Sequence, residues 1–178
     1  MTKIALVYGA IAGSIVVGSI LAGILLGSDH GGQSLWFGYL IMILALSLIF
    51  LGVKSYRDRQ GGGVIKFGPA LFLGLMIAVV AGVFYVGGWE AYLAATDYSF
   101  MPSYVDQIIE SKKAAGLTGE ALAAEVAKLE EMKANYENPL YRMPLTFVEI
   151  FPVGLVIAIV SAAILRNPKA FPARGAAK

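Results

Sequence analysis

Four long runs of apolar residues, separated by short polar links and one longer insert, constrain this chain more than any other feature. The first run, Ile4 to Leu26, contains no charged residue, and the others cover Leu35–Val53, Phe67–Tyr92 and Pro144–Leu165. A helix needs about 20 apolar residues to cross a hydrocarbon core about 30 Å thick. The pattern therefore predicts one membrane domain, an all-α bundle of four transmembrane helices.

The composition supports lipid as the solvent of this chain. Of its 178 residues 58% are hydrophobic and 15% charged, and the mean hydropathy is +0.72, which a water-soluble domain of this size does not reach. The absence of cysteine excludes disulfides, thiol catalysis and cysteine-ligated metals. The single histidine, His30, does not make a usual zinc or haem site by itself. We expect no cofactor and no metal.

Basic residues next to the apolar runs predict the orientation of the chain. The runs place nine of them on one side: Lys3, Lys54, Arg57, Arg59, Lys66, Arg166, Lys169, Arg174 and Lys178. Lys and Arg near span ends mark the cytoplasmic side, so we expect both termini in the cytoplasm. A cleaved signal peptide is the alternative for the first run, but that run is longer than such peptides usually are.

The segment 96–142 between the third and fourth runs is polar and acidic, with eight carboxylates against five basic residues. Its apolar residues recur at helical spacing, and Gly116 and Gly119 interrupt the pattern. Thr118 is a candidate N-cap, and Asn138-Pro139 ends the second helical stretch. The insert is predicted to be an extracytoplasmic, periplasmic hairpin of two amphipathic helices.

Small residues recur along the first run. Gly9 and Gly13 form a GxxxG pair, and Ser14, Gly18 and Ala22 continue a row with Ala10 at every fourth position. Small residues let helix backbones approach closely in lipid. The favoured interpretation is packing within this chain's own bundle, and the alternative is a surface for self-association or for a partner.

One carboxylate, Glu149, lies inside the fourth run, where an isolated charge is costly. Pro152 follows three residues later and removes a backbone donor, which usually kinks a helix. Glu90, at the end of the third run, is expected at a similar depth, and together with Arg142 and Tyr141 these residues are candidates for a polar cluster. The functional hypothesis is an ion, proton or headgroup site; the simpler one is interfacial carboxylates that touch water or Arg142.

No residue pattern indicates an enzyme. Asp29-His30 lies in a Gly-rich turn, and adjacent residues there do not define a proton-handling pair. Gly61-Gly62-Gly63 lacks the Lys-Ser/Thr that follows in a phosphate-binding loop, so it predicts a hinge and no nucleotide site. We expect the lipid bilayer as a partner, with ordinary attraction of the basic face to anionic headgroups, and no nucleic acid.

Short motifs extend over nearly the whole chain: a Gly-rich first span, Gly52-Val53-Lys54-Ser55-Tyr56-Arg57, Phe151-Pro152-Val153-Gly154 and Ser161-Ala162-Ala163-Ile164-Leu165-Arg166. In these the chain resembles the DUF4199 family of uncharacterised bacterial membrane proteins. The resemblance implies a bacterial source and the inner membrane. It implies no activity and no catalytic residues.

Three functional hypotheses follow. The first is a structural or accessory subunit that associates with itself or with a larger membrane complex. The second is a small transporter or channel component that uses Glu149 near the proline kink at Pro152. An enzyme that acts on lipid is third, because no nucleophile, base and metal set stands at a readable spacing.

Overall fold

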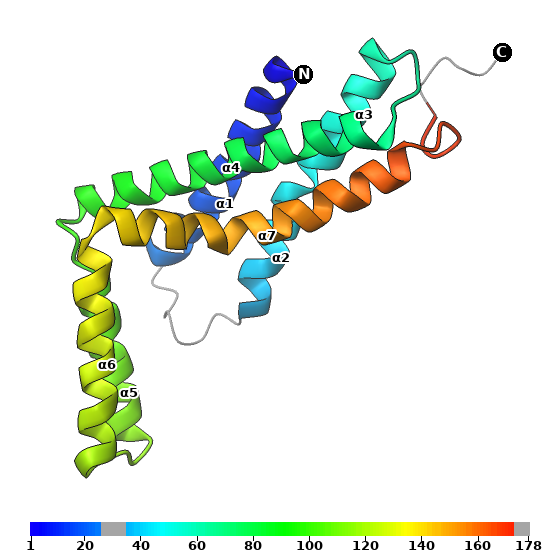
Figure 1. Cartoon of the computed structure of the whole chain (residues 1–178). Coiled ribbons are helices and arrows are strands. Elements are labelled where there is room, and N and C mark those ends of the chain that lie inside the picture. The colour runs from blue at the N-terminus through cyan, green and yellow to red at the C-terminus, as the bar shows by residue number, and fades with distance from the viewer. Residues whose placement is uncertain (26–34, 173–178) are drawn as a thin grey trace. The chain divides into compact units, whose positions relative to one another are not determined.

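The computed structural model describes residues 1–25 and 35–172, and these form seven helices and no strand (Figure 1). The helices are α1 Thr2–Leu25, α2 Leu35–Leu46, α3 Leu48–Gln60, α4 Phe67–Ala95, α5 Phe100–Ala114, α6 Gly119–Glu137 and α7 Pro139–Leu165. Four stretches, Thr2–Leu25, Gly38–Gln60, Phe67–Ala95 and Pro139–Leu165, are long and apolar enough to cross a membrane. The predicted all-α fold with four spans is confirmed, and the chain is a multi-pass membrane protein.

The second span differs from the predicted range in its middle and at its end. Helix α2 gives way to α3 at Ser47, whose hydroxyl donates to the carbonyl of Leu44 at 2.6 Å. Helix α3 then continues past Val53 to Gln60. It does so because Lys54 pairs with Asp58 one turn later, which favours helix where the apolar run has already ended.

The fourth span begins earlier than its apolar run. The side chain of Asn138 accepts a hydrogen bond from the backbone N–H of Leu140 at 2.9 Å, as an N-cap residue does. Pro139 occupies the first helical position, which tolerates proline because its missing N–H has no helical partner there. Helix α7 therefore already contains Arg142 when the apolar run begins.

The chain divides into two compact units, and both α4 and α7 contribute to each. Unit 1 comprises Met1–Gly88 and the chain from Phe147 onward; unit 2 comprises Trp89–Thr146. Whether the whole chain is one membrane domain, as the sequence predicts, stays a prediction.

Helix α4 supplies the largest share of the core of unit 1. Its fully buried residues include Leu73, Ile77 and Ala81. Glycines allow neighbouring helices to approach it: a Cβ atom placed on Gly13 of α1 would lie 2.3 Å from the carbonyl oxygen of Ala81. One on Gly154 of α7 would lie 2.9 Å from the Cβ of Ala78 on α4. Helices α1 and α7 thus pack on α4 at backbone distance, where dispersion contacts replace the hydrophobic effect as the driving force.

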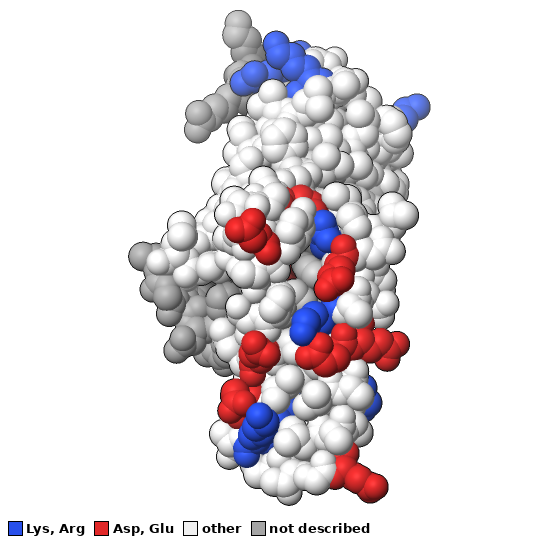
Figure 2. Space-filling view, turned by 90° about the vertical axis from the view of Figure 1, so that its left-hand side faces the viewer, with Lys and Arg blue, Asp and Glu red and all other residues white. Residues whose placement is uncertain are grey.

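Helices α5 and α6 form the hairpin of unit 2 (Figure 1). Glycines with positive φ, Gly116 and Gly119, form the turn between them, and Thr118 occupies the N-cap position of α6 without a side-chain cap bond. Lys112 of α5 pairs with Glu125 of α6 at 2.7 Å. Hydrogen bonds from Lys112 and then Lys128 lower the pKa of Glu125 to about 2. Acidic and basic side chains are intermingled over the face of the molecule shown in Figure 2.

A buried arginine connects the end of α3 to the segment that follows α7. Arg57 is fully buried, and its guanidinium donates to the carbonyl oxygen of Ala170 at 2.8 Å and to that of Phe171. Its Nε also pairs with Asp58 at 2.8 Å. The ring of Phe171 packs edge-on against Phe50, with centroids 5.3 Å apart. This segment of unit 1 is therefore held by both polar and aromatic contacts.

Candidate functional site

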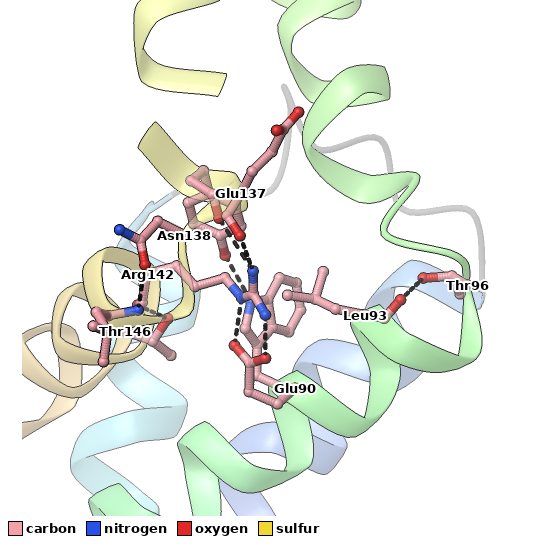
Figure 3. Close-up of polar contacts among 10 residues, drawn as sticks. Glu90, Leu93, Thr96, Glu137, Asn138, Arg142 and Thr146 are labelled. Carbon is pink, nitrogen blue, oxygen red and sulfur yellow. Dashed lines mark hydrogen bonds and ion pairs between the residues drawn. The ribbon is translucent and has the colours of Figure 1, made fainter. Parts of the chain in front are cut away.

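A polar cluster of unit 2 surrounds the buried side chain of Arg142, where α4 ends and α7 begins (Figure 3). Arg142 is 4% exposed. Its Nε and Nη2 atoms donate to the two carboxylate oxygens of Glu90, each at 2.7 Å. Such a bidentate pair between ionised groups is stronger than a neutral hydrogen bond and fixes orientation as well as distance.

The remaining face of the guanidinium binds the end of the hairpin. Nη1 of Arg142 donates to the carbonyl oxygens of Glu137, at 2.9 Å, and Tyr136, at 3.3 Å. These are the last residues of α6, whose final carbonyls lack helical partners. The guanidinium also lies 4.9 Å from the centre of the Tyr98 ring. One side chain thereby joins α4, α6, α7 and the turn before α5.

The turn that carries Tyr98 has an unusual backbone. Asp97 and Tyr98 have φ angles of 49° and 55°, the left-handed region that costs residues other than glycine roughly 1–2 kcal/mol each. The backbone N–H of Tyr98 donates to the carbonyl of Leu93 at 2.8 Å, which closes the end of α4. The conformation places Tyr98 over Arg142, and both residues line the same cavity.

Aromatic residues support the cluster from the α4 side. The indole N–H of Trp89 donates to the hydroxyl of Tyr136 at 2.8 Å. The Trp89 ring packs edge-on against Phe100, with centroids 4.8 Å apart. Aromatic rings with a polar edge settle where apolar and wet surroundings meet, which agrees with their position at the end of a span.

A cavity of about 460 Å³ lies beside Arg142 in unit 2. Four charged residues line it, namely Asp97, Lys133, Glu137 and Arg142, together with Tyr98 and Tyr136. Lys133 pairs with Glu130 at 2.8 Å, and this carboxylate raises the pKa of Lys133. The cavity therefore presents both signs of charge at neutral pH.

Glu149 belongs to unit 1 and has a different environment. Its side chain is exposed on the surface of α7, and its Oε2 atom accepts a hydrogen bond from the hydroxyl of Tyr85 at 2.9 Å. Tyr85, on α4, is only 3% exposed. Pro152 is exposed as well, and α7 continues through it as one helix. Glu149 is thus a carboxylate that a buried hydroxyl holds at the outer surface of a span.

The four residues predicted as a polar or ion site divide between the two units. Glu90 and Arg142 pair in unit 2, whereas Glu149 and Pro152 lie in unit 1. Sequence reasoning missed Tyr85 and Tyr98. Tyr85 and Glu149 belong to different helices, so the sequence does not indicate that they are partners. The left-handed backbone of Tyr98 could not be predicted either, because such a conformation is usually expected at a glycine.

The small residues of α1 also separate into two groups. Gly9 and Gly13 are buried against α4, with a Cβ on Gly9 only 2.6 Å from that of Val80. Ser14, Gly18 and Ala22 are exposed, and a Cβ on Gly18 would meet nothing within 4 Å.

Metal-binding groups are sparse in the part of the chain that the structure describes. No three His, Cys, Asp or Glu side chains among these residues come close enough to hold a metal ion. Asp29 and His30 lie outside the described residues.

Comparison with known proteins identifies a family for this chain. A family model described as a protein of unknown function, DUF4199, matches residues 7–167, which is most of the chain. No curated protein and no solved structure matches.

Proposed function

From the premise that the chain belongs to DUF4199, a family of unknown function, we propose that it is a structural or accessory subunit of the bacterial inner membrane. It associates with itself or with a larger membrane complex through the face of α7 that carries Glu149. The single observation behind this proposal is the exposed carboxylate of Glu149 in the middle of an apolar span.

Helix length gives the expected depth of that carboxylate in the membrane. Helix α7 has 27 residues and is about 40 Å long at 1.5 Å per residue, about 10 Å longer than a hydrocarbon core. Glu149 comes ten residues after Pro139, about 15 Å along the helix. If the excess length is shared between both ends, the carboxylate lies about 10 Å inside the core. A carboxylate at that depth is costly in lipid, and a polar group from a partner helix lowers the cost.

Tyr85 makes this surface specific. A long glutamate side chain in a span normally reaches toward water, but the bond from the buried Tyr85 hydroxyl holds Glu149 at the helix surface. The neighbouring exposed residues Val148 and Val156 are apolar. The surface therefore offers one fixed hydrogen-bond acceptor, the Glu149 carboxylate, among apolar side chains. Such a surface suits a partner transmembrane helix that carries a hydrogen-bond donor.

Removal of the carboxylate should weaken association. We expect Glu149→Leu to lower the affinity of the complex roughly tenfold, the scale of one interhelical hydrogen bond in a membrane. Gentle-detergent purification of the tagged protein, with the mass of the intact particle and mass spectrometry of co-purified chains, measures this. Val7→Leu, an exposed apolar change on α1 and outside the face of α7 that carries Glu149, is the control and should leave the particle unchanged. A particle of the same mass and composition in Glu149→Leu would contradict the proposal.

An ion or proton pathway is the second candidate, and the same residue supports it. A single bundle of four helices encloses little space, so a pathway at the outer surface of α7 requires an oligomer. In that case Glu149→Gln abolishes flux in liposomes while the assembly and its thermal stability remain. Loss of assembly without any flux in the parent protein favours the accessory function.

The proposed orientation puts both termini in the cytoplasm and the hairpin in the periplasm. It is supported by the basic residues at the ends of the spans on one side, such as Lys54, Arg59 and Lys66.

Cysteine labelling checks this orientation, because the chain contains no cysteine of its own. We expect Ala123→Cys, exposed on α6, to react with a membrane-impermeant maleimide in spheroplasts. Gln60→Cys, exposed at the end of α3, should react only after the membrane is broken. The reverse pattern would invert the topology.

A further inference from the structure

The cavity beside Arg142 has no part in the proposed association surface, yet it has the size of a ligand site. Small-molecule sites occupy roughly 300–1,000 Å³, and this cavity measures about 460 Å³. Its lining residues all belong to unit 2. The cavity is therefore formed within one compact part of the chain.

The lining differs in polarity between its buried and its exposed residues. Leu93 of α4 is 1% exposed and Met101 of α5 is 8% exposed, and both line the cavity. Asp97 and Glu137 also line it, and both are exposed. A ligand that enters the cavity therefore meets carboxylates where water is present and apolar side chains where it is not.

The cations of the lining are already paired. Among the described residues that line the cavity, Arg142 and Lys133 carry positive charge. Arg142 donates to both carboxylate oxygens of Glu90, and Lys133 pairs with Glu130 at 2.8 Å. Neither cation is left to attract an anionic ligand.

The carboxylates of the lining are not balanced in this way. Asp97 and Glu137 form no ion pair with any other residue that the structure describes. The hydrogen bond to Glu130, and then the charges of Asp106 and Glu137, raise the pKa of Lys133 because they stabilise its charged form. Negative charge is thus in excess around the cavity, which attracts a cation and repels an anion.

An organic cation fits this lining better than a metal ion does. No three His, Cys, Asp or Glu side chains among the described residues come close enough to hold a metal, whereas a calcium ion takes six to eight oxygen ligands. The rings of Tyr98 and Tyr136 line the cavity together with Leu93 and Met101. These groups have contacts to offer only to a cation that carries an apolar body.

We propose that this cavity binds an organic cation of the alkylammonium class. The ammonium group lies on the exposed side with Asp97 and Glu137, and the alkyl body contacts Leu93 and Met101. The ammonium keeps part of its water there, so binding does not require the burial of an unpaired charge. The ligand class follows from the excess of negative charge together with the buried apolar lining.

Trp89 provides a reporter for binding. The chain has two tryptophans, and Trp36→Phe, an exposed position on α2, leaves Trp89 alone. The indole of Trp89 donates to the hydroxyl of Tyr136, which lines the cavity. In nonionic detergent micelles at constant ionic strength, titration with octylammonium should produce a saturable change in Trp89 fluorescence. Octanoate, which has the opposite charge, and methylammonium, which lacks the apolar body, should each bind at least about tenfold more weakly.

Variants of the two carboxylates assign the effect to the cavity. Asp97→Asn and Glu137→Gln should each weaken octylammonium binding about threefold, and the double variant about tenfold, the scale of exposed charge interactions that add. Asparagine also tolerates the left-handed backbone at position 97. Glu120→Gln and Glu131→Gln are the matched controls, exposed on α6 but outside the lining, and should bind like the parent protein.

Lys133→Met reports the sign of the ligand charge. It removes a cation from the lining and leaves Glu130 without its partner, so octylammonium should bind about threefold more tightly. Lys113→Met is the matched control, because Lys113 pairs with Glu110 at 2.8 Å with the same spacing but lies outside the lining, and it should change nothing. Weaker binding in Lys133→Met would contradict a cationic ligand.

Three further outcomes would overturn the proposal. Equal binding of octylammonium and octanoate would show that the charge is not recognised. Parent-like binding in the double carboxylate variant would place the amine elsewhere in the protein or in the micelle. Methylammonium bound as tightly as octylammonium would show that the apolar lining does not contact the ligand.

Discussion

Replacement of Arg142 by methionine is expected to destabilise unit 2 by about 3–5 kcal/mol, the loss found when one partner of a buried ion pair is removed. The reason is that Glu90 then keeps a largely buried charge without its partner, at 15% side-chain exposure. The carbonyls of Tyr136 and Glu137 lose their donor at the same time. Thermal unfolding in detergent should show a lower transition temperature, and trypsin should cut faster at Lys112 and Lys133.

Two further variants separate charge from geometry. Arg142→Lys keeps the charge but not the bidentate fork, so we expect a loss between those of the parent protein and Arg142→Met. Arg166→Met removes an exposed arginine just beyond α7 and should change little. Parent-like unfolding and proteolysis of Arg142→Met would show that the cluster does not hold the hairpin in place.

A single methyl group at Gly13 is expected to separate α1 from α4 and to destabilise unit 1 by about 3 kcal/mol, at the upper end of overpacking effects. The added Cβ of Gly13→Ala would lie 2.3 Å from the carbonyl oxygen of Ala81 and 2.8 Å from the Cβ of Phe84. The carbonyl belongs to the backbone of α4, so no side-chain rotation relieves the overlap. Denaturant titration in mixed micelles measures the change.

Gly18→Ala is the matched control on the same helix and should have the opposite sign. Its Cβ meets nothing within 4 Å, and alanine is favoured over glycine inside a helix by about 1 kcal/mol. The pair of variants therefore compares one chemical change in a packed and in an open environment. A gain in stability from Gly13→Ala would contradict the close packing of α1 on α4.

The helical fold could be predicted from the sequence because it depends on local quantities. Hydropathy and length set the four spans, and helical spacing with Gly116 and Gly119 set the hairpin. The exact ends of the helices were harder to predict from the sequence. The early start of α7 depends on the bond from Leu140 to Asn138, and the extension of α3 on pairing of Lys54 with Asp58, and hydropathy records neither.

The residues of the polar sites could be predicted from the sequence, but the partners with which they interact could not. Glu90 and Arg142 attract attention because charges near an apolar run are costly. Their pairing depends on where α6 ends and on the left-handed turn at Tyr98, which are tertiary features. The hydrogen bond between Glu149 and Tyr85, which lies 64 residues earlier in the chain, could likewise not be predicted from the sequence.

The contacts of Arg57 have a consequence for the order in which parts of the chain can pack during synthesis. Its acceptors, the carbonyls of Ala170 and Phe171, leave the ribosome more than one hundred residues after it does. Until then the guanidinium in the end of α3 has Asp58 but not these carbonyls, so the first half of the protein reaches the membrane with its most buried cation only partly satisfied. Final packing around Arg57 therefore waits for residues that are translated much later than α3, so insertion of α3 and its final packing are separate steps in time.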